Sequence, residues 1–218
     1  SEDFWLRDGS VVLVCGAVGF RVHASVLCMH SEAFREMPEI SAGEQQETAD
    51  KDAKVQEQVK EMFDGCPVLR LQDAPSDMRY FLKALYDRSY VSPFVQDKCA
   101  HSLFVLASVL QMATKYRVRP LRVELARFLA ALFPTTRTAY RDLLHSSPSR
   151  VPPPDFHPLL GLEIARQCAL PQVLPTACLG AARLPLDTIF DGFRLQDGRW
   201  VKSAQDVVRA CVAFREKL

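Results

Sequence analysis

The chain has 218 residues, of which 48% are hydrophobic and 24% charged, and its formal net charge is +1. This composition is that of an ordinary globular protein, and it excludes wholesale disorder, a collagen-like fibre and a coiled-coil rod. No stretch approaches about 20 uninterrupted apolar residues, so we expect no membrane-spanning segment. The acidic start, residues 1–3, lacks the features of a secretory signal, and we expect an intracellular protein, cytoplasmic or nuclear.

The small net charge hides an asymmetry between the two halves of the chain. Residues 1–114 carry 11 basic and 17 acidic residues, a net charge of −6, and residues 115–218 carry 16 and 9, a net charge of +7. The arginines of the second half are scattered, with no basic run and no interleaved aromatic residues, so solvated helix surfaces explain them better than nucleic-acid binding. We expect no direct contact with nucleic acid.

Seven cysteines are spaced irregularly, without any Cys-x-x-Cys pair, and several lie inside apolar runs. This usage is typical of small buried hydrophobic residues in a reducing compartment. Two Cys-x-His pairs, Cys28 with His30 and Cys99 with His101, could supply four zinc ligands, but one intervening residue is too few for the usual structural zinc site. The sequence therefore predicts no metal and no cofactor.

The first structured stretch is predicted to be a β-hairpin. Residues 11–15 are rich in β-branched side chains and are followed by a glycine-containing turn over residues 16–19. Residues 20–23 alternate apolar and polar side chains, which places Phe20 and Val22 on one face of the second strand.

Two short helices and an acidic insert are expected next. Residues 24–29 predict a short buried helix, and Ser31 predicts the N-cap of the following helix. Residues 38–66 hold 8 acidic and 3 basic residues and few large apolar side chains, so they predict a mostly mobile insert. Within it, residues 54–63 have apolar side chains at helical spacing, and a transient helix is expected there.

Regular structure is expected to resume after the insert. The pattern predicts a strand over residues 68–71 and a helix that begins near Ser76. Two further helices are predicted over residues 103–116 and 121–133, separated by Pro120, which is expected to break the chain. The order of strands and helices over residues 1–133 indicates an α+β domain.

The remainder is expected to be a linker and an extension. Residues 134–157 are rich in proline and serine and predict an extended linker. Residues 158–218 predict an all-helical extension, with helices over residues 159–169, 172–182, 187–193 and 204–214.

Signatures of catalysis are missing from the sequence. It contains no nucleophile elbow, phosphate-binding loop or HExxH zinc motif. Gly16 and Gly19 follow a strand but fit a hairpin turn better than a nucleotide site, and His23 is best explained as a junction residue that bonds local backbone groups. We expect a protein that is not an enzyme; zinc-assisted hydrolysis through the Cys-x-His pairs is the enzymatic alternative.

An apolar segment, residues 4–6 (Phe4, Trp5 and Leu6), precedes the first predicted strand. Large aromatic side chains outside a core often mark a surface that binds a partner. The segment is therefore predicted to be an exposed contact site, with the alternative that it folds back on its own domain.

Five motifs follow one another in a fixed order across the first 133 residues. They are DGSVVLV at residues 8–14, FRVHASVL at 20–27, SEAF at 31–34, VLRL at 68–71 with FLKALYD at 81–87, and ATKYRV at 113–118 followed by Leu121. In this order and spacing, residues 4–133 resemble a BTB/POZ domain, and residues 158–218 look like the extra helices that follow this domain in many fungal members.

The resemblance implies a non-enzymatic module that homodimerises through its N-terminal segment and first helix and recruits other proteins. The dimer residues that it implies are Phe4, Trp5, Leu6, Ala24, Leu27 and Cys28. It also implies possible binding of a cullin scaffold, for which the ligase-facing helix would offer Met78, Tyr80 and Leu82. The alternatives are a monomeric substrate adaptor of a cullin-RING ubiquitin ligase and a transcription-regulatory scaffold.

Overall fold

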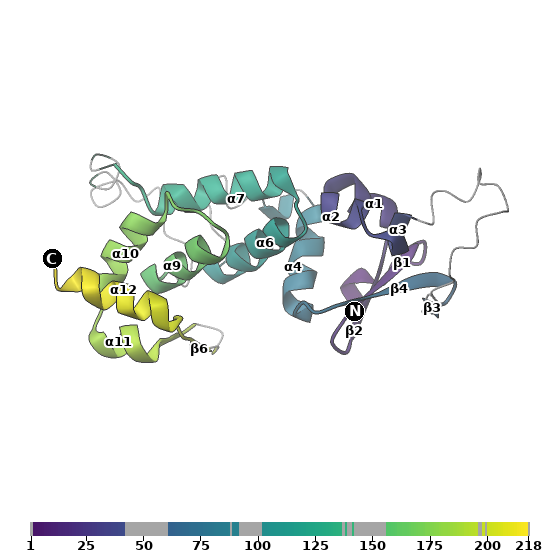
Figure 1. Ribbon diagram of the computed structural model, residues 1–218. Coiled ribbons are helices and arrows are strands. Elements are labelled where there is room, and N and C mark those ends of the chain that lie inside the picture. The colour runs from purple at the N-terminus through teal and green to yellow at the C-terminus, as the bar shows by residue number, and fades with distance from the viewer. Residues whose placement is uncertain are drawn as a thin grey trace. The chain divides into compact units, whose positions relative to one another are not determined.

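The computed structural model describes residues 2–41, 61–87, 89–91, 102–136, 138, 141, 156–195, 198 and 200–217. The chain divides into two compact units (Figure 1). The first unit comprises Ser1–Arg88 and Met112–Arg119, and the second comprises Ser89–Gln111 and Pro120–Leu218. The first unit combines a sheet with helices, and the fold class is α+β, as predicted.

A four-stranded sheet forms the centre of the first unit. It contains β1 (Val11–Cys15), β2 (Val18–Val22), β3 (Met62–Phe63) and β4 (Cys66–Leu71), in the order β2-β1-β4-β3. β1 is antiparallel to β2 and parallel to β4, and β3 is antiparallel to β4. The predicted hairpin is confirmed, with Leu13 paired to Phe20 and both side chains fully buried. Its turn is shorter than expected, because Val18 and Gly19 belong to β2.

The helices of the first unit are α1 (Ala24–His30), α2 (Glu32–Arg35), α3 (Pro38–Ser41), α4 (Pro75–Tyr86) and the end of α6 (Leu103–Lys115), with a short 3-10 turn over Glu2–Phe4. They alternate with the strands along the chain, with α1 to α3 between β2 and β3 and α4 after β4. The predicted N-cap of α2 is confirmed, since Ser31 Oγ accepts a hydrogen bond from the Phe34 N–H at 3.1 Å. The expectation that α1 is buried is wrong for most of it: Leu27 is fully buried, but Met29 is exposed.

Tyr116 forms the centre of the core of this unit. Its ring stacks on Phe34, with centroids 4.4 Å apart, and on Phe81, with centroids 5.5 Å apart. Its hydroxyl donates to Asp73 Oδ2 at 2.5 Å, and its carbonyl accepts from Ser31 Oγ at 2.5 Å. Through its side chain and its carbonyl, Tyr116 thus joins segments that are distant in the sequence.

Two sequence-based expectations are corrected here. Residues 38–66 were expected to be a mobile insert, but α3 lies at its start and β3 at its end, while residues 42–60 lie outside the described residues. Met62 and Phe63 are in a strand and not in a helix. Pro120 does not break the chain, because it occupies the second position of α7 (Arg119–Leu132), where a helix tolerates the missing N–H.

Helices make up most of the second unit. They are the first part of α6, most of α7, α9 (Pro158–Gln167), α10 (Leu174–Ala182), α11 (Leu186–Asp191) and α12 (Gln205–Arg215). The extension is not all-helical as predicted, since Phe193–Arg194 (β5) pairs antiparallel with Trp200–Val201 (β6). Gly192, with a φ of 92°, ends α11 and directs the chain into this hairpin.

The two compact units are divided at other residues than the predicted domain, linker and extension. Residues 89–111 and 120–133 group with the C-terminal helices. The boundaries predicted at residues 133 and 158 stay predictions, and most of the proposed linker lies outside the described residues.

Candidate interaction surface

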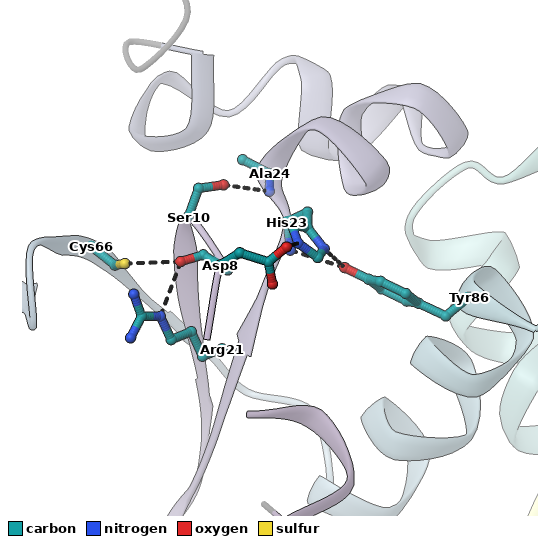
Figure 2. Close-up of polar contacts among 8 residues, drawn as sticks. Asp8, Ser10, Arg21, His23, Ala24, Cys66 and Tyr86 are labelled. Carbon is teal, nitrogen blue, oxygen red and sulfur yellow. Dashed lines mark hydrogen bonds and ion pairs between the residues drawn. The ribbon is translucent and has the colours of Figure 1, made fainter. Parts of the chain in front are cut away.

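A hydrogen-bond network around His23 fixes the segment that leads into β1 (Figure 2). Tyr86 Oη, at the end of α4, accepts from the His23 backbone N–H at 2.9 Å and lies 3.1 Å from His23 Nδ1. On the other side of the ring, His23 Nε2 lies 3.2 Å from Asp8 Oδ2. The Tyr86 hydroxyl hydrogen is available for Nδ1. The hydrogen bond between His23 and Asp8 lowers the pKa of Asp8.

The two residues after Asp8 are held from both sides (Figure 2). The Gly9 carbonyl accepts from Arg21 Nε at 3.0 Å and from Cys66 Sγ at 3.2 Å. A Cβ on Gly9 would lie 2.8 Å from Arg21 Cγ, so glycine is required where the chain passes this close to β2. Ser10 Oγ accepts from the Ala24 N–H at 3.0 Å, at the first residue of α1. The segment is therefore anchored to the sheet and to α1 together.

His23 was predicted to bond local backbone groups, and its partners are different. Its ring bonds the side chains of Tyr86 and Asp8, which come from distant and from preceding parts of the chain. The arrangement positions the start of α1, and burial raises the pKa of the Tyr86 hydroxyl.

An exposed aromatic pair lies beside this network. The rings of Trp5 and Phe63 meet edge to face, with centroids 5.8 Å apart and planes 80° apart. Trp5 is 41% exposed, Phe63 54% and the adjacent Met62 56%. We call Trp5 and Phe63 the aromatic surface, because Met62, next to Phe63 in β3, lies on the opposite face of the strand. The Leu6 N–H donates to the Arg21 carbonyl at 3.0 Å, so Trp5 is held in place on the edge of β2.

Ion pairs flank the aromatic surface in the sequence of the β3–β4 hairpin. Asp64, directly after Phe63, binds Arg21 at 2.7 Å. Glu61, directly before Met62, accepts two hydrogen bonds from Arg70, at 2.8 and 2.6 Å, which lower the pKa of Glu61. An apolar centre with a polar rim is typical of protein–protein contact sites.

The predicted N-terminal contact residues have three different environments. Trp5 is exposed, as expected, and Leu6 is half-buried. The expectation of exposure is wrong for Phe4, which is 7% exposed and packs against Tyr86, with ring centroids 5.8 Å apart. The alternative that the segment folds back on its own domain therefore holds for Phe4.

Sequence reasoning missed Met62 and Phe63 because it assigned them to an acidic insert with a transient helix. The signal that could have found them is the Asp64-Gly65 dipeptide. Its two residues have φ values of 49° and 74°, as in a type I′ turn, and Asp-Gly is a strong hairpin signal when apolar residues flank it.

The residues expected on α1 do not share one environment either. Leu27 is fully buried and belongs to the core, whereas Ala24 and Cys28 are half-buried. On the proposed ligase-facing helix, α4, Met78 and Leu82 are fully buried and face the interior, and Tyr80 is half-buried. Contacts of Ala24, Cys28 and Tyr80 with partners stay predictions.

Within the described residues, no group of three or more His, Cys, Asp or Glu side chains could hold a metal ion. Of the two Cys-x-His pairs, Cys28 is half-buried with His30 exposed, and the second pair lies outside the described residues. A separate finding concerns membranes: across the part of the chain that the structure describes, no helix combines the length and apolar character needed to span a bilayer.

Comparison with known proteins agrees with the motifs and the sheet. A search of curated proteins found no match to the chain. A family model for the BTB/POZ domain matches residues 7–132, which is more than half of the 218 residues. The match covers the β1–β2 hairpin, α1 to α4, β4 and the helices α6 and α7. The chain therefore belongs to the BTB/POZ domain family.

Proposed function

We propose that this protein–protein interaction module self-associates through the aromatic surface, Trp5 and Phe63. BTB/POZ domains generally act as interaction modules and not as enzymes, and the family supports the coarser statement that this chain binds proteins. The exposed and fixed Trp5–Phe63 ring pair is the single observation that carries the proposal.

The physical reason for this proposal is that binding costs little conformational entropy, because this surface is already ordered. The Leu6–Arg21 hydrogen bond and the β3–β4 pairing already fix the backbone that carries the two side chains. A partner therefore gains burial of large apolar groups with little loss of side-chain freedom. In a two-fold dimer the same patch contributes from each subunit.

A stable dimer needs about 800 Å² of surface from each partner, which two side chains do not supply alone. We propose that Leu6, Ala24 and Cys28, which are half-buried, belong to the contact. Phe4 and Leu27 are buried in the core, from where they would support the contact without touching the partner.

The test is sedimentation velocity over a concentration series, with Trp5→Ala and Phe63→Ala as variants. Each should weaken self-association by roughly tenfold or more. Trp200→Ala is the matched control, because it removes a tryptophan that is 61% exposed on the second unit. A wild type that stays monomeric throughout, or equal weakening by Trp200→Ala, would overturn the proposal.

Two further roles are alternatives with less support. An adaptor of a cullin-RING ligase would use α4, where Tyr80 alone of the three expected residues reaches the surface. A transcription-regulatory scaffold has no separate supporting feature among the described residues. BTB proteins are typically intracellular, and we propose the cytoplasm or nucleus for this chain.

A further inference from the structure

The β5–β6 hairpin of the second unit has one packed face and one exposed face. Strand pairing sets Phe193 opposite Val201 and Arg194 opposite Trp200. Because residues directly opposite one another in an antiparallel pair share a face, the two pairs lie on different faces of the hairpin. The first face is packed, since the Phe193 ring is stacked on His157 with centroids 3.6 Å apart. The second face carries Arg194 and Trp200, which are both exposed.

Trp200 is held in place on this face although it is 61% exposed. Its indole Nε1 donates to the Asp191 carbonyl, at the end of α11, at 2.8 Å. The chain that follows Trp200 passes close to Gly192, where an added Cβ would lie 2.2 Å from the Val201 carbonyl oxygen. These contacts fix the position of the ring, so a partner that covers it orders little that is not already ordered.

Two cationic side chains lie on the same face as the Trp200 ring. Arg194 is its cross-strand neighbour, and Arg194 Nε donates to the Gly198 carbonyl at 2.9 Å, which fixes this side chain as well. Lys202 comes two residues after Trp200, and both are exposed, whereas the residue between them is half-buried. This alternation is typical of an extended chain whose residues two apart share a face. We call Arg194, Trp200 and Lys202 the hairpin surface.

The charges of the hairpin surface favour an apolar group flanked by carboxylates. Exposed indole and guanidinium groups are common in the centres of protein–protein contacts, and the cations attract a partner of opposite charge. Two acidic residues on α11, Asp187 and Asp191, are exposed next to this region in the sequence. A nucleic acid is charged at every phosphate and would be repelled by them. A peptide can place a neutral residue there, so the charges favour a peptide over a nucleic acid.

We propose that the hairpin surface binds an extended acidic segment of another protein, in which an acidic residue lies two positions from an aromatic or large aliphatic residue. Side chains two apart in an extended chain lie on one face, about 7 Å from one another. This spacing matches Trp200 and Lys202, which are two residues apart. The apolar residue packs on the indole, and carboxylates pair with Lys202 and Arg194. The hairpin surface belongs to the second unit, so the inference is independent of self-association through the first.

The experiment adds a synthetic peptide with blocked ends, Gly-Glu-Ser-Phe-Ser-Glu-Gly, to the isotope-labelled full chain. NMR follows the indole N–H signal of Trp200, which the Trp200→Phe variant identifies. We expect a shift that saturates with peptide, and a Kd that rises with salt because the charges are screened. A peptide with alanine in place of phenylalanine should bind roughly tenfold more weakly.

Lys202→Glu tests the charges without touching the packing, since an exposed side chain away from the core has little effect on stability. It should weaken binding of the peptide by roughly threefold or more. A peptide with lysine in place of one glutamate should bind Lys202→Glu more tightly than it binds the wild type. Trp5→Ala is the matched control: it removes an exposed tryptophan of the first unit and should leave the affinity for the peptide unchanged.

Several results would overturn the inference. A Trp200 signal that does not move, or equal binding of the alanine peptide, would show that the indole is not the contact. Equal weakening by Trp5→Ala would place the peptide on the first unit. Tighter binding of single-stranded polythymidylate than of the peptide would assign the surface to nucleic acid. A Trp200 signal that shifts on dilution of the protein alone would assign it to a second copy of this chain.

Discussion

The ring of Tyr116 is stacked on the ring of Phe34, with centroids 4.4 Å apart and planes only 5° apart. This stack directs the Tyr116 hydroxyl to Asp73, whose side chain is 8% exposed and is also bound by Lys115 Nζ at 2.6 Å. The buried carboxylate is thus satisfied by two donors from the end of α6 and the turn after it.

Tyr116→Phe should keep the stack and remove the hydrogen bond to Asp73. Because a charged acceptor loses a donor in a mostly buried site, we expect the free energy of unfolding to fall by about 1–3 kcal/mol. Urea denaturation measures this. Tyr80→Phe on α4 is the control, and its effect should stay within about 0.5 kcal/mol. Equal effects of the two variants would contradict the role given to the hydroxyl.

The hydrogen bond between Tyr116 and Asp73 also predicts how the stability of the protein depends on pH. Burial, and then the hydrogen bond to Asp73, raise the pKa of Tyr116. In the unfolded chain this tyrosine ionises near its ordinary pKa of about 10, while the folded protein keeps the proton, so stability falls as pH rises above about 10. Tyr116→Phe lacks this loss. The stability gap between wild type and variant should therefore narrow between about pH 9 and pH 11, and a constant gap in urea titrations would refute the assignment.

Ser31→Ala removes two hydrogen bonds of one hydroxyl, the cap of α2 and the bond to the Tyr116 carbonyl. We expect a loss of about 2 kcal/mol, since both bonds are buried. Ser10→Ala is the control: it removes a single bond at the start of α1 in an exposed position, and should cost about 0.5–1 kcal/mol. Thermal or urea unfolding measures both losses of stability. A larger loss for Ser10→Ala than for Ser31→Ala would show that the buried cap is unimportant.

Gly161→Ala tests packing in the second unit. A Cβ at residue 161 would lie 2.1 Å from the Phe133 ring, so we expect destabilisation of about 3 kcal/mol or more. Gly180→Ala is the matched control on α10, where a Cβ would lie 3.1 Å from Pro158 and alanine favours the helix. Adding Phe133→Leu to Gly161→Ala should recover part of the loss. A Gly161→Ala protein as stable as Gly180→Ala would show that the ring moves aside freely.

Local sequence signals were sufficient to predict the elements in which the type of a residue determines the backbone conformation. Ser31 has the side chain that an N-cap needs, and Phe20 and Val22 alternate with polar residues on a half-buried strand. The same holds for β4, whose central residues were predicted as a strand. The partners of Ser31 and of β2 are adjacent in the chain, whereas β4, whose partner β1 is distant, could be recognised from its own apolar residues.

Tertiary contacts decided the elements that were missed. Met62 and Phe63 have apolar neighbours at helical spacing, but pairing with β4 outweighs that local preference. Phe4 is buried because Tyr86, at the end of α4, covers it, and nothing near residue 4 in the sequence indicates this. The composition of residues 4–6 predicted an exposed surface, but of the two aromatic residues in this segment only Trp5 is exposed.

The path of the chain through the first unit has a consequence for its biosynthesis. Residues up to Arg88 belong to this unit, and the chain returns to it only at Met112. While the ribosome is still translating the intervening residues, Phe34 has no Tyr116 ring to stack on and Ser31 Oγ has no Tyr116 carbonyl to bind. Until α6 has left the exit tunnel, the aromatic core of the nascent N-terminal segment is therefore incomplete. Binding of a chaperone would be most useful in that interval.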